Sequence, residues 1–147
     1  MIRQKFDIPK YEWTVYVYYS VHSYYRDEIL DMLDWIRCPK DIMKHVNVNL
    51  SKNNMDTGFT YSSSEMKSTV MVIGTSSNYK QLLNSIDHES RHLVDDISKY
   101  YDIDSSGEEV AYLTGYIGEI TAPYVKLFIC DCNCCKEKLD NLALGLN

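Results

Sequence analysis

The fold of this chain is indicated most clearly by residues 78–100, NYKQLLNSIDHESRHLVDDISKY. At about 100° per residue, its apolar side chains fall on one side of an α-helix, as expected for a helix that packs on a core. Asn78 is a favourable N-cap, and Gln81 stands three residues later, where a reciprocal cap is expected. The sequence therefore predicts a long amphipathic helix whose core face is formed by Leu82, Leu83, Ile86, Leu93, Ile97 and Tyr100.

Inside this helix stands an H-E-x-x-H pattern formed by His88, Glu89 and His92. Side chains four residues apart lie on one face of a helix, about one turn apart, so both imidazoles can reach one metal ion. Glu89 points about 100° away from His88, between the histidines and the core, where it can take a proton from a metal-bound water without being a ligand. The pattern predicts a catalytic metal site, with His88 and His92 as ligands and Glu89 as the general base.

A tetrahedral catalytic zinc site needs a third protein ligand and an open position for water. The next predicted helix, residues 106–120, offers Glu108, which shares a stripe with the small residues Ala111 and Gly115. Small residues on this stripe would let the second helix approach the first closely. Glu108 is therefore the expected third ligand, and Glu109, about 100° away around the helix, is the alternative.

Three further residues are candidates for supporting roles. Asp96 sits one turn beyond His92 and could accept a hydrogen bond from an imidazole N–H, although a solvated acidic face explains it equally well. Tyr112 and Tyr116 could stabilise an oxyanion through their phenol groups, although packing is the commoner role of such tyrosines.

The rest of the chain predicts an α+β fold, with a small antiparallel or mixed sheet packed against helices. Ser105 and Glu108 fit a capping box before the second helix, and Pro123 marks its end. Residues 1–125 are expected to form one domain, followed by a cysteine-rich tail at 126–147. The other expected elements are a strand at 12–19, a helix at 23–37, a short helical piece at 41–45, a loop at 46–58, and a hairpin of strands at 58–63 and 67–73.

Composition narrows the class of protein. The chain has 147 residues, of which 45% are hydrophobic and 24% charged, which excludes a disordered tail, a collagen-like repeat and a coiled coil. It has no apolar run near the roughly 18–20 residues of a membrane span, and its first residues show no secretory signal. Fifteen basic and 21 acidic residues give a net charge of −6. Without a basic run, neither nucleic acid nor membrane is an expected partner.

The five cysteines are unevenly placed. Cys130, Cys132, Cys134 and Cys135 crowd into the tail, and Cys38 stands alone. No spread framework of pairs is visible, which predicts free thiols in a reducing, cytoplasmic compartment. The tail spacing does not match the paired C-x2-C pattern of structural zinc sites, so solvated thiols are expected there, with a second metal site as the alternative.

The histidine motif and the downstream glutamate resemble the zincin metallopeptidases, in particular the gluzincin type. Residues 108–116, EEVAYLTGY, are similar to small zincin-like proteins encoded by bacteriophages and mobile elements. The resemblance implies a minimal zincin-like fold with the motif on its central long helix, one Zn²⁺ per chain, and a peptide or protein substrate. It also implies a sheet edge strand that holds an extended peptide beside the metal, best matched by residues 67–73.

The function expected from the sequence is that of a zinc-dependent metallopeptidase. Glu89 would take the proton of a water activated by zinc and pass it to the leaving amine. Such an enzyme would act in the cytoplasm of a bacterium or of a phage-infected cell. The alternative is a non-enzymatic, metal-binding accessory or structural protein of a phage or mobile element, which the small size of the chain suggests.

Overall fold

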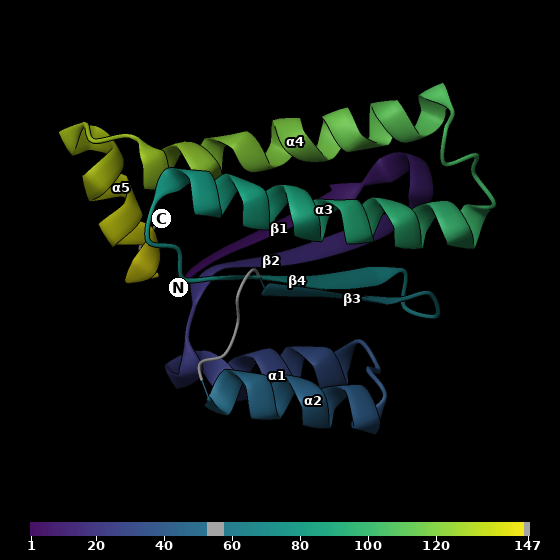
Figure 1. Cartoon of the computed structure of the whole chain (residues 1–147), viewed down its shortest axis with the longest axis horizontal. Helices are drawn as coiled ribbons and strands as arrows, with labels where there is room; N and C mark the ends of the chain where they lie inside the picture. The colour runs from purple at the N-terminus through teal and green to yellow at the C-terminus, as the bar shows by residue number, and fades with distance from the viewer. Residues whose placement is uncertain (53–57, 146–147) are drawn as a thin grey trace.

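A computed structural model of the chain describes residues 1–52 and 58–145. Within these residues, four strands form one mixed sheet in the order β1-β2-β4-β3, and five α-helices pack around it (Figure 1). The predicted α+β fold class is confirmed. The elements are β1 (Ile2–Ile8), η1 (Pro9–Tyr11), β2 (Trp13–Val21), η2 (Ser23–Tyr25), α1 (Arg26–Trp35), α2 (Lys40–Ser51), β3 (Gly58–Ser63), β4 (Ser68–Gly74), α3 (Tyr79–Tyr101), α4 (Glu108–Ile129) and α5 (Asn133–Ala143).

Helices cover both faces of the sheet, so the fold has three layers (Figure 1). On the face covered by α3 and α4, Val15 of β2 and Met71 of β4 belong to the larger buried cluster. On the face covered by α1 and α2, Tyr18 of β2 and Val72 of β4 belong to a second cluster. Side chains of a strand point alternately to opposite faces, so the two central strands serve both clusters.

The strand predicted to form the edge of the sheet, residues 67–73, is instead an inner strand. As β4, it pairs in parallel with β2 and antiparallel with β3. Every residue of β4 is buried, whereas β3 is only partly buried along most of its length. A continuous apolar run of this kind is typical of a strand covered on both faces. The outer strand on this side is therefore β3, which forms the predicted hairpin with β4.

The predicted long helix is confirmed as α3. The Asn78 side chain accepts a hydrogen bond from the Gln81 backbone N–H at 3.0 Å, and the Gln81 side chain accepts one from the Ser77 N–H at 2.8 Å. At the other end, Asp102 adopts a left-handed conformation and its N–H donates to the Ser98 carbonyl. Of the predicted core face, Leu83 and Tyr100 are substantially exposed. The buried residues are Leu82, Ser85, Ile86, Glu89, Leu93, Val94, Ile97 and Ser98.

Helix α4 differs from its prediction at both ends. Its N-cap is Gly107, without a side-chain cap, so the predicted capping box of Ser105 and Glu108 is wrong. Asp104 accepts the hydrogen bond from the Ser106 N–H at 2.9 Å and closes the turn before the helix. The predicted end at Pro123 is also wrong, because the helix continues to Ile129. Pro123 faces solvent while the apolar stripe of the helix continues on the buried side.

Part of the loop predicted at 46–58 is helical. Residues 46–51 complete α2. Its buried side chains Val46 and Leu50 belong to the second cluster, against the sheet. Residues 53–57 of that predicted loop lie outside the described residues, and Gly58 already belongs to β3. Apolar positions four residues apart outweigh the polar composition of this segment.

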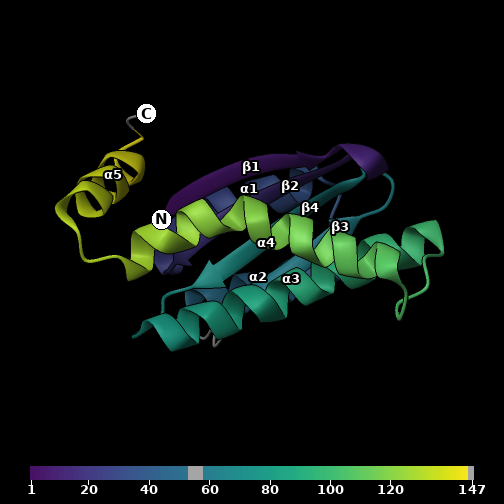
Figure 2. The same ribbon diagram turned by 90° about the horizontal axis from the view of Figure 1, so that it is seen from above.

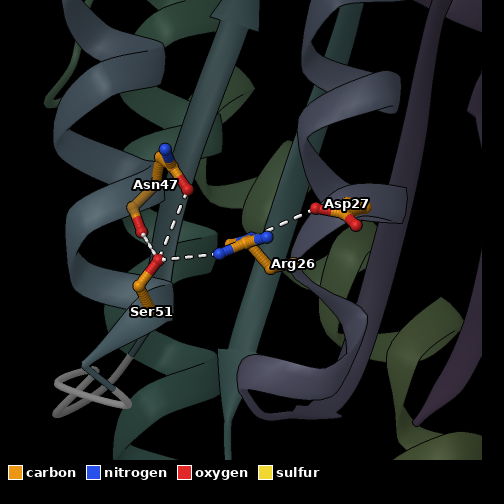
Figure 3. Close-up of polar contacts among 4 residues, drawn as sticks. All are labelled: Arg26, Asp27, Asn47 and Ser51. Carbon is orange, nitrogen blue, oxygen red and sulfur yellow. Dashed lines mark hydrogen bonds and ion pairs between the residues drawn. The ribbon is translucent and has the colours of Figure 1, made fainter.

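Polar contacts join α1 to α2 at the outer face of this layer (Figure 3). The Arg26 guanidinium donates to the Ser51 hydroxyl at 3.2 Å and forms an ion pair with Asp27 at 3.1 Å. The Ser51 hydroxyl donates in turn to the Asn47 carbonyl at 2.6 Å. These contacts involve exposed residues, and they tie the start of α1 to the end of α2.

The last helix, α5, lies at one end of the molecule, beyond the end of α4 (Figure 2). It contacts β1, and its side chains Leu139 and Leu142 pack against the larger core cluster. Residues 126–129, which the sequence assigns to the tail, form the last turn of α4. Among the described residues, none of the helices combines the length and apolar character that crossing a membrane requires.

Candidate metal centres

His88 and His92 lie on the exposed side of α3 with their ring nitrogens close together. The two Nε2 atoms are 3.2 Å apart, and the ring centroids are 4.9 Å apart at an interplanar angle of 76°. Their spacing of four residues places them on successive turns of one helix face. The structure therefore confirms that the two imidazoles converge, as the motif predicts.

This separation fits two ligands of one metal ion. Nitrogen ligands bind Zn²⁺ at about 2.0–2.1 Å, so two of them in tetrahedral geometry lie about 3.3 Å apart. The observed distance of 3.2 Å between the Nε2 atoms agrees with that value. Both side chains face solvent, so an ion could reach them without a change in the fold. The pair has the chemistry and spacing of half a tetrahedral site.

Glu89 lies on the side of α3 that faces the sheet. Its side chain is buried, with 2% of its surface exposed. The Thr60 hydroxyl of β3 lies 2.8 Å from the Glu89 Oε2 atom and donates to it, and the same hydroxyl lies 3.1 Å from the Glu89 carbonyl oxygen. A buried carboxylate needs such partners, because burial removes its hydration. The outer strand of the sheet thus fixes the Glu89 carboxylate on the buried side of α3, whereas the two histidines face solvent.

The predicted third ligand, Glu108, does not join the histidine pair. α3 and α4 run in opposite directions (Figures 1 and 2), and Glu108 begins α4 at the end where α3 stops. His92 stands nine residues before that end of α3, which corresponds to about 13 Å of helix. In the described residues, the only group of three or more His, Cys, Asp or Glu ligand atoms within 4.8 Å of one another consists of cysteines.

The alternative ligand, Glu109, is engaged elsewhere. Its carboxylate forms an ion pair with the Lys10 ammonium at 2.7 Å and accepts a hydrogen bond from the Tyr11 hydroxyl at 2.8 Å. The hydrogen bond from Lys10 holds the pKa of Glu109 below its usual value. Both partners come from the turn between β1 and β2, so Glu109 ties the start of α4 to that turn.

The small residues Ala111 and Gly115 do not lie at the contact between α4 and α3, which corrects the prediction. Ala111 and Gly115 are exposed, and a Cβ placed on Gly115 would meet no atom within 4 Å. The helix instead buries a different stripe, formed by Val110, Leu113, Ile117, Thr121 and Val125. Because those apolar side chains face the core, the stripe of small residues is turned outward.

The two candidate oxyanion tyrosines, Tyr112 and Tyr116, line a cavity of about 600 Å³ with Ala111 and Gly115, beside the turn between β1 and β2. Tyr112 is 76% exposed, and the Tyr116 hydroxyl donates to the Asp7 carbonyl at 3.1 Å. Neither contact involves the histidine pair. The tyrosines belong to the outer side of α4 rather than to the motif on α3.

The acidic residues that follow the motif also have other neighbours. Asp95 forms an ion pair with Arg91 at 2.9 Å. Asp96, the predicted partner of an imidazole, lines a cavity of about 310 Å³ with Trp13, Lys99 and other residues. Both carboxylates are half-buried, and Asp96 lies toward the β3–β4 hairpin.

A second group of potential ligands lies between α4 and α5. The sulfur atoms of Cys130, Cys132 and Cys135 all lie within 4.8 Å of one another. The Cys130 and Cys132 sulfurs are 3.2 Å apart, and those of Cys132 and Cys134 are 3.0 Å apart. Hydrogen bonds from the Cys134 thiol and then the Cys130 thiol lower the pKa of Cys132 to about 6. This cluster could hold a metal ion.

The sequence contains a signal for this cluster. Cys132 and Cys135 have the C-x2-C spacing, and they occupy the N-cap and the first turn of α5. Side chains at the N-cap and three residues later meet at the start of a helix, as they do in a capping box. The sequence-based interpretation as solvated thiols overlooks this pair, because the end of α4 and the start of α5 were not predicted.

Comparison of the chain with protein-family models, with curated proteins and with solved structures found no match. The resemblance to zincin metallopeptidases therefore stays a prediction.

Proposed function

We propose that this protein is a metal-dependent peptidase, with zinc bound by His88 and His92 and with Glu89 as the general base. The observation that carries the proposal is the pair of Nε2 atoms 3.2 Å apart, on the stretch of α3 that also carries the buried Glu89. Two imidazole ligands leave positions for solvent and substrate, which a catalytic site needs and a closed structural site lacks.

Zinc bound at this pair would supply Lewis acidity, which lowers the pKa of water and polarises a carbonyl group. Glu89 would accept a proton from the attacking water and deliver it to the amine that leaves. The Thr60 hydroxyl, 2.8 Å from the Glu89 Oε2 atom, would fix the carboxylate against the sheet so that it does not need to reorganise during proton transfer.

The outer strand β3 is the proposed binding surface for the peptide substrate. Only one of its two edges pairs, with β4, so the other is open among the described residues. An extended peptide can pair with such an edge through main-chain hydrogen bonds that do not depend on its sequence. Thr60 joins this strand to Glu89, which would bring a peptide on β3 close to the base.

A non-enzymatic metal-binding protein is the second candidate. It is favoured because no carboxylate among the described residues completes a three-ligand group with His88 and His92. It is also favoured by the direction of Glu89, which points at the sheet and away from solvent. In this case the metal would stabilise a surface for a protein partner, and binding would not require Glu89.

Metal analysis and peptide cleavage by one set of variants separate the two candidates. We would use tag-free protein carrying Cys132→Ser, so that bound zinc reports on the histidines. Glu89→Gln should retain one zinc per chain and lose cleavage of a peptide library, whereas His88→Ala should lose both. Glu119→Gln, an exposed glutamate on α4, serves as the matched control. Cleavage at the normal rate by Glu89→Gln would reject the peptidase mechanism.

A further inference from the structure

The turn between α4 and α5 brings together sulfur atoms from three structural positions. Cys130 ends α4, Cys132 is the N-cap of α5, and Cys135 lies in the first turn of α5. The backbone is extended at both Cys130 (φ −93°, ψ 123°) and Cys132 (φ −68°, ψ 148°), which turns the chain between the two helices. The three thiols converge because the turn is short and the start of α5 folds back on it.

The donor set selects a particular class of ion. All members are sulfur, and thiolates favour soft or borderline ions such as Zn²⁺ and Cu⁺ over Mg²⁺ and Ca²⁺. Sulfur atoms that bind one zinc ion at about 2.3 Å in tetrahedral geometry lie about 3.8 Å apart. The observed group lies within 4.8 Å, with one pair at 3.2 Å, so small side-chain rotations reach the bound geometry. All five cysteines of the chain are free, so no disulfide competes.

The three thiols of the cluster differ in their exposure to solvent. Cys135 is buried, Cys130 is half-buried and Cys132 is exposed. An ion would thus sit on the inner thiol and enter from the solvent side. Cys134 is exposed, its sulfur lies 3.0 Å from that of Cys132, and it lies outside the group of three.

Helix α5 is short and mostly exposed. It has 11 residues, and Cys135 is its only buried one. Isolated helices shorter than about 12–15 residues are marginal in water, so α5 depends on its contacts. Leu139 and Leu142 supply part of them against the core. A metal ion shared between the end of α4 and the start of α5 would fix the helix at its base.

We infer that Cys130, Cys132 and Cys135 bind one thiophilic ion, Zn²⁺ or Cu⁺, as thiolates, and that this ion anchors α5. Each coordinating thiol releases its proton to solvent when the ion binds. The site is separate from the histidine pair in its donors and in its place in the fold. It therefore holds whether or not the protein is a peptidase.

Cobalt(II) is the probe of choice, because thiolate ligands give it a strong sulfur-to-metal charge-transfer absorption in the near ultraviolet that imidazoles do not. Metal-free, reduced, full-length protein carrying His88→Ala and His92→Ala would be titrated without oxygen. We expect the band to saturate at one equivalent and to be lost on addition of zinc or Cu⁺. Adding Cys132→Ser should abolish the band, and Cys132 is exposed, so this change should not disturb folding.

Two matched variants complete the test. Cys38→Ser changes a buried thiol packed against the other face of the sheet and should leave the band intact. Cys134→Ser should also retain it, because Cys134 lies outside the group of three. Limited proteolysis should show that zinc protects α5 in the parent protein and not in Cys132→Ser. The inference would be overturned if the band were absent from the protein that carries only His88→Ala and His92→Ala. It would also be overturned if the band persisted after Cys132→Ser is added, with circular dichroism unchanged.

Discussion

The histidine pair on α3 and the cysteine cluster at the α4–α5 turn are formed in different ways. His88 and His92 meet because four residues make about one turn of any α-helix, and the rest of the fold has little influence on their separation. Cys130, Cys132 and Cys135 meet only because α4 ends at Ile129 and α5 begins at Asn133. A ligand set inside one helix can be predicted from spacing alone, whereas one that spans a turn depends on where two helices stop and start.

Replacing the base at the histidine site should give the largest effect. Glu89→Gln is expected to lower the rate of peptide hydrolysis by about 10²–10⁴-fold, because the amide cannot accept the proton. Zinc content should not change, since Glu89 is not a ligand. Stopped assays on a peptide library, with zinc measured on the same samples, check both expectations. Loss of zinc together with activity would indicate that Glu89 is a ligand instead.

Removing metal from the cysteine site should have the next largest effect, on stability. Saturation of a site at about 100 times its dissociation constant stabilises the folded state by about 2.7 kcal/mol. A chelator should therefore lower the melting temperature of protein that carries His88→Ala, and Cys132→Ser should make the melting temperature insensitive to chelator. An equal response to chelator in the two proteins would show that the cysteines are not the source of the stabilisation.

A smaller effect is expected from the contact between β3 and Glu89. Thr60→Val keeps the shape of the side chain and removes the hydroxyl that donates to the Glu89 carboxylate. Removing a hydrogen-bond donor from a buried polar group lowers the free energy of unfolding by about 1–3 kcal/mol, which chemical denaturation can measure. Hydrolysis should fall because the base is less well fixed, with zinc content unchanged. Thr14→Val, at a hydroxyl that donates to the exposed Asp7 carboxylate at 2.7 Å, is the control.

The smallest expected effect is a pH dependence of stability that comes from an ion pair outside both metal sites. The hydrogen bond from Arg3 lowers the pKa of Glu28, so this ion pair stabilises the folded state above the ordinary glutamate pKa. That contribution is lost as the pH falls through the lowered pKa. The pair is largely exposed and screened, so Glu28→Gln should cost less than about 1 kcal/mol at neutral pH. Chemical denaturation of the metal-free proteins should show that the free energies of unfolding of the unsubstituted protein and Glu28→Gln become equal at acidic pH.

The fold was predictable where hydrophobic spacing is regular. The 23-residue helix α3, with its Asn78 cap, and the β3–β4 hairpin follow from local pattern. β1 also carries such a pattern, with Ile2, Phe6 and Ile8 on its buried side, although the sequence-based prediction does not include it. Strand order was not predictable, because the pairing of β4 with β2 joins segments far apart in the chain.

The candidate sites show the same division. The convergence of the two histidines and the inward position of Glu89 follow from helix geometry. The position of Glu108 relative to the histidines could not be predicted, because it depends on the length of α3 beyond His92 and on the stripe that α4 buries. The C-x2-C spacing of Cys132 and Cys135 was visible, but its meaning depended on a helix beginning at Asn133.

We claim that the chain carries two separate metal sites, and zinc stoichiometry across four proteins decides it. The proteins are the tag-free parent, His88→Ala, Cys132→Ser and the combined variant, each reduced, loaded with zinc and freed of excess ion. We expect two zinc ions per chain in the parent, one in each single variant and none in the combination. A parent with no tightly bound zinc, or single variants that each lose all of it, would contradict the claim.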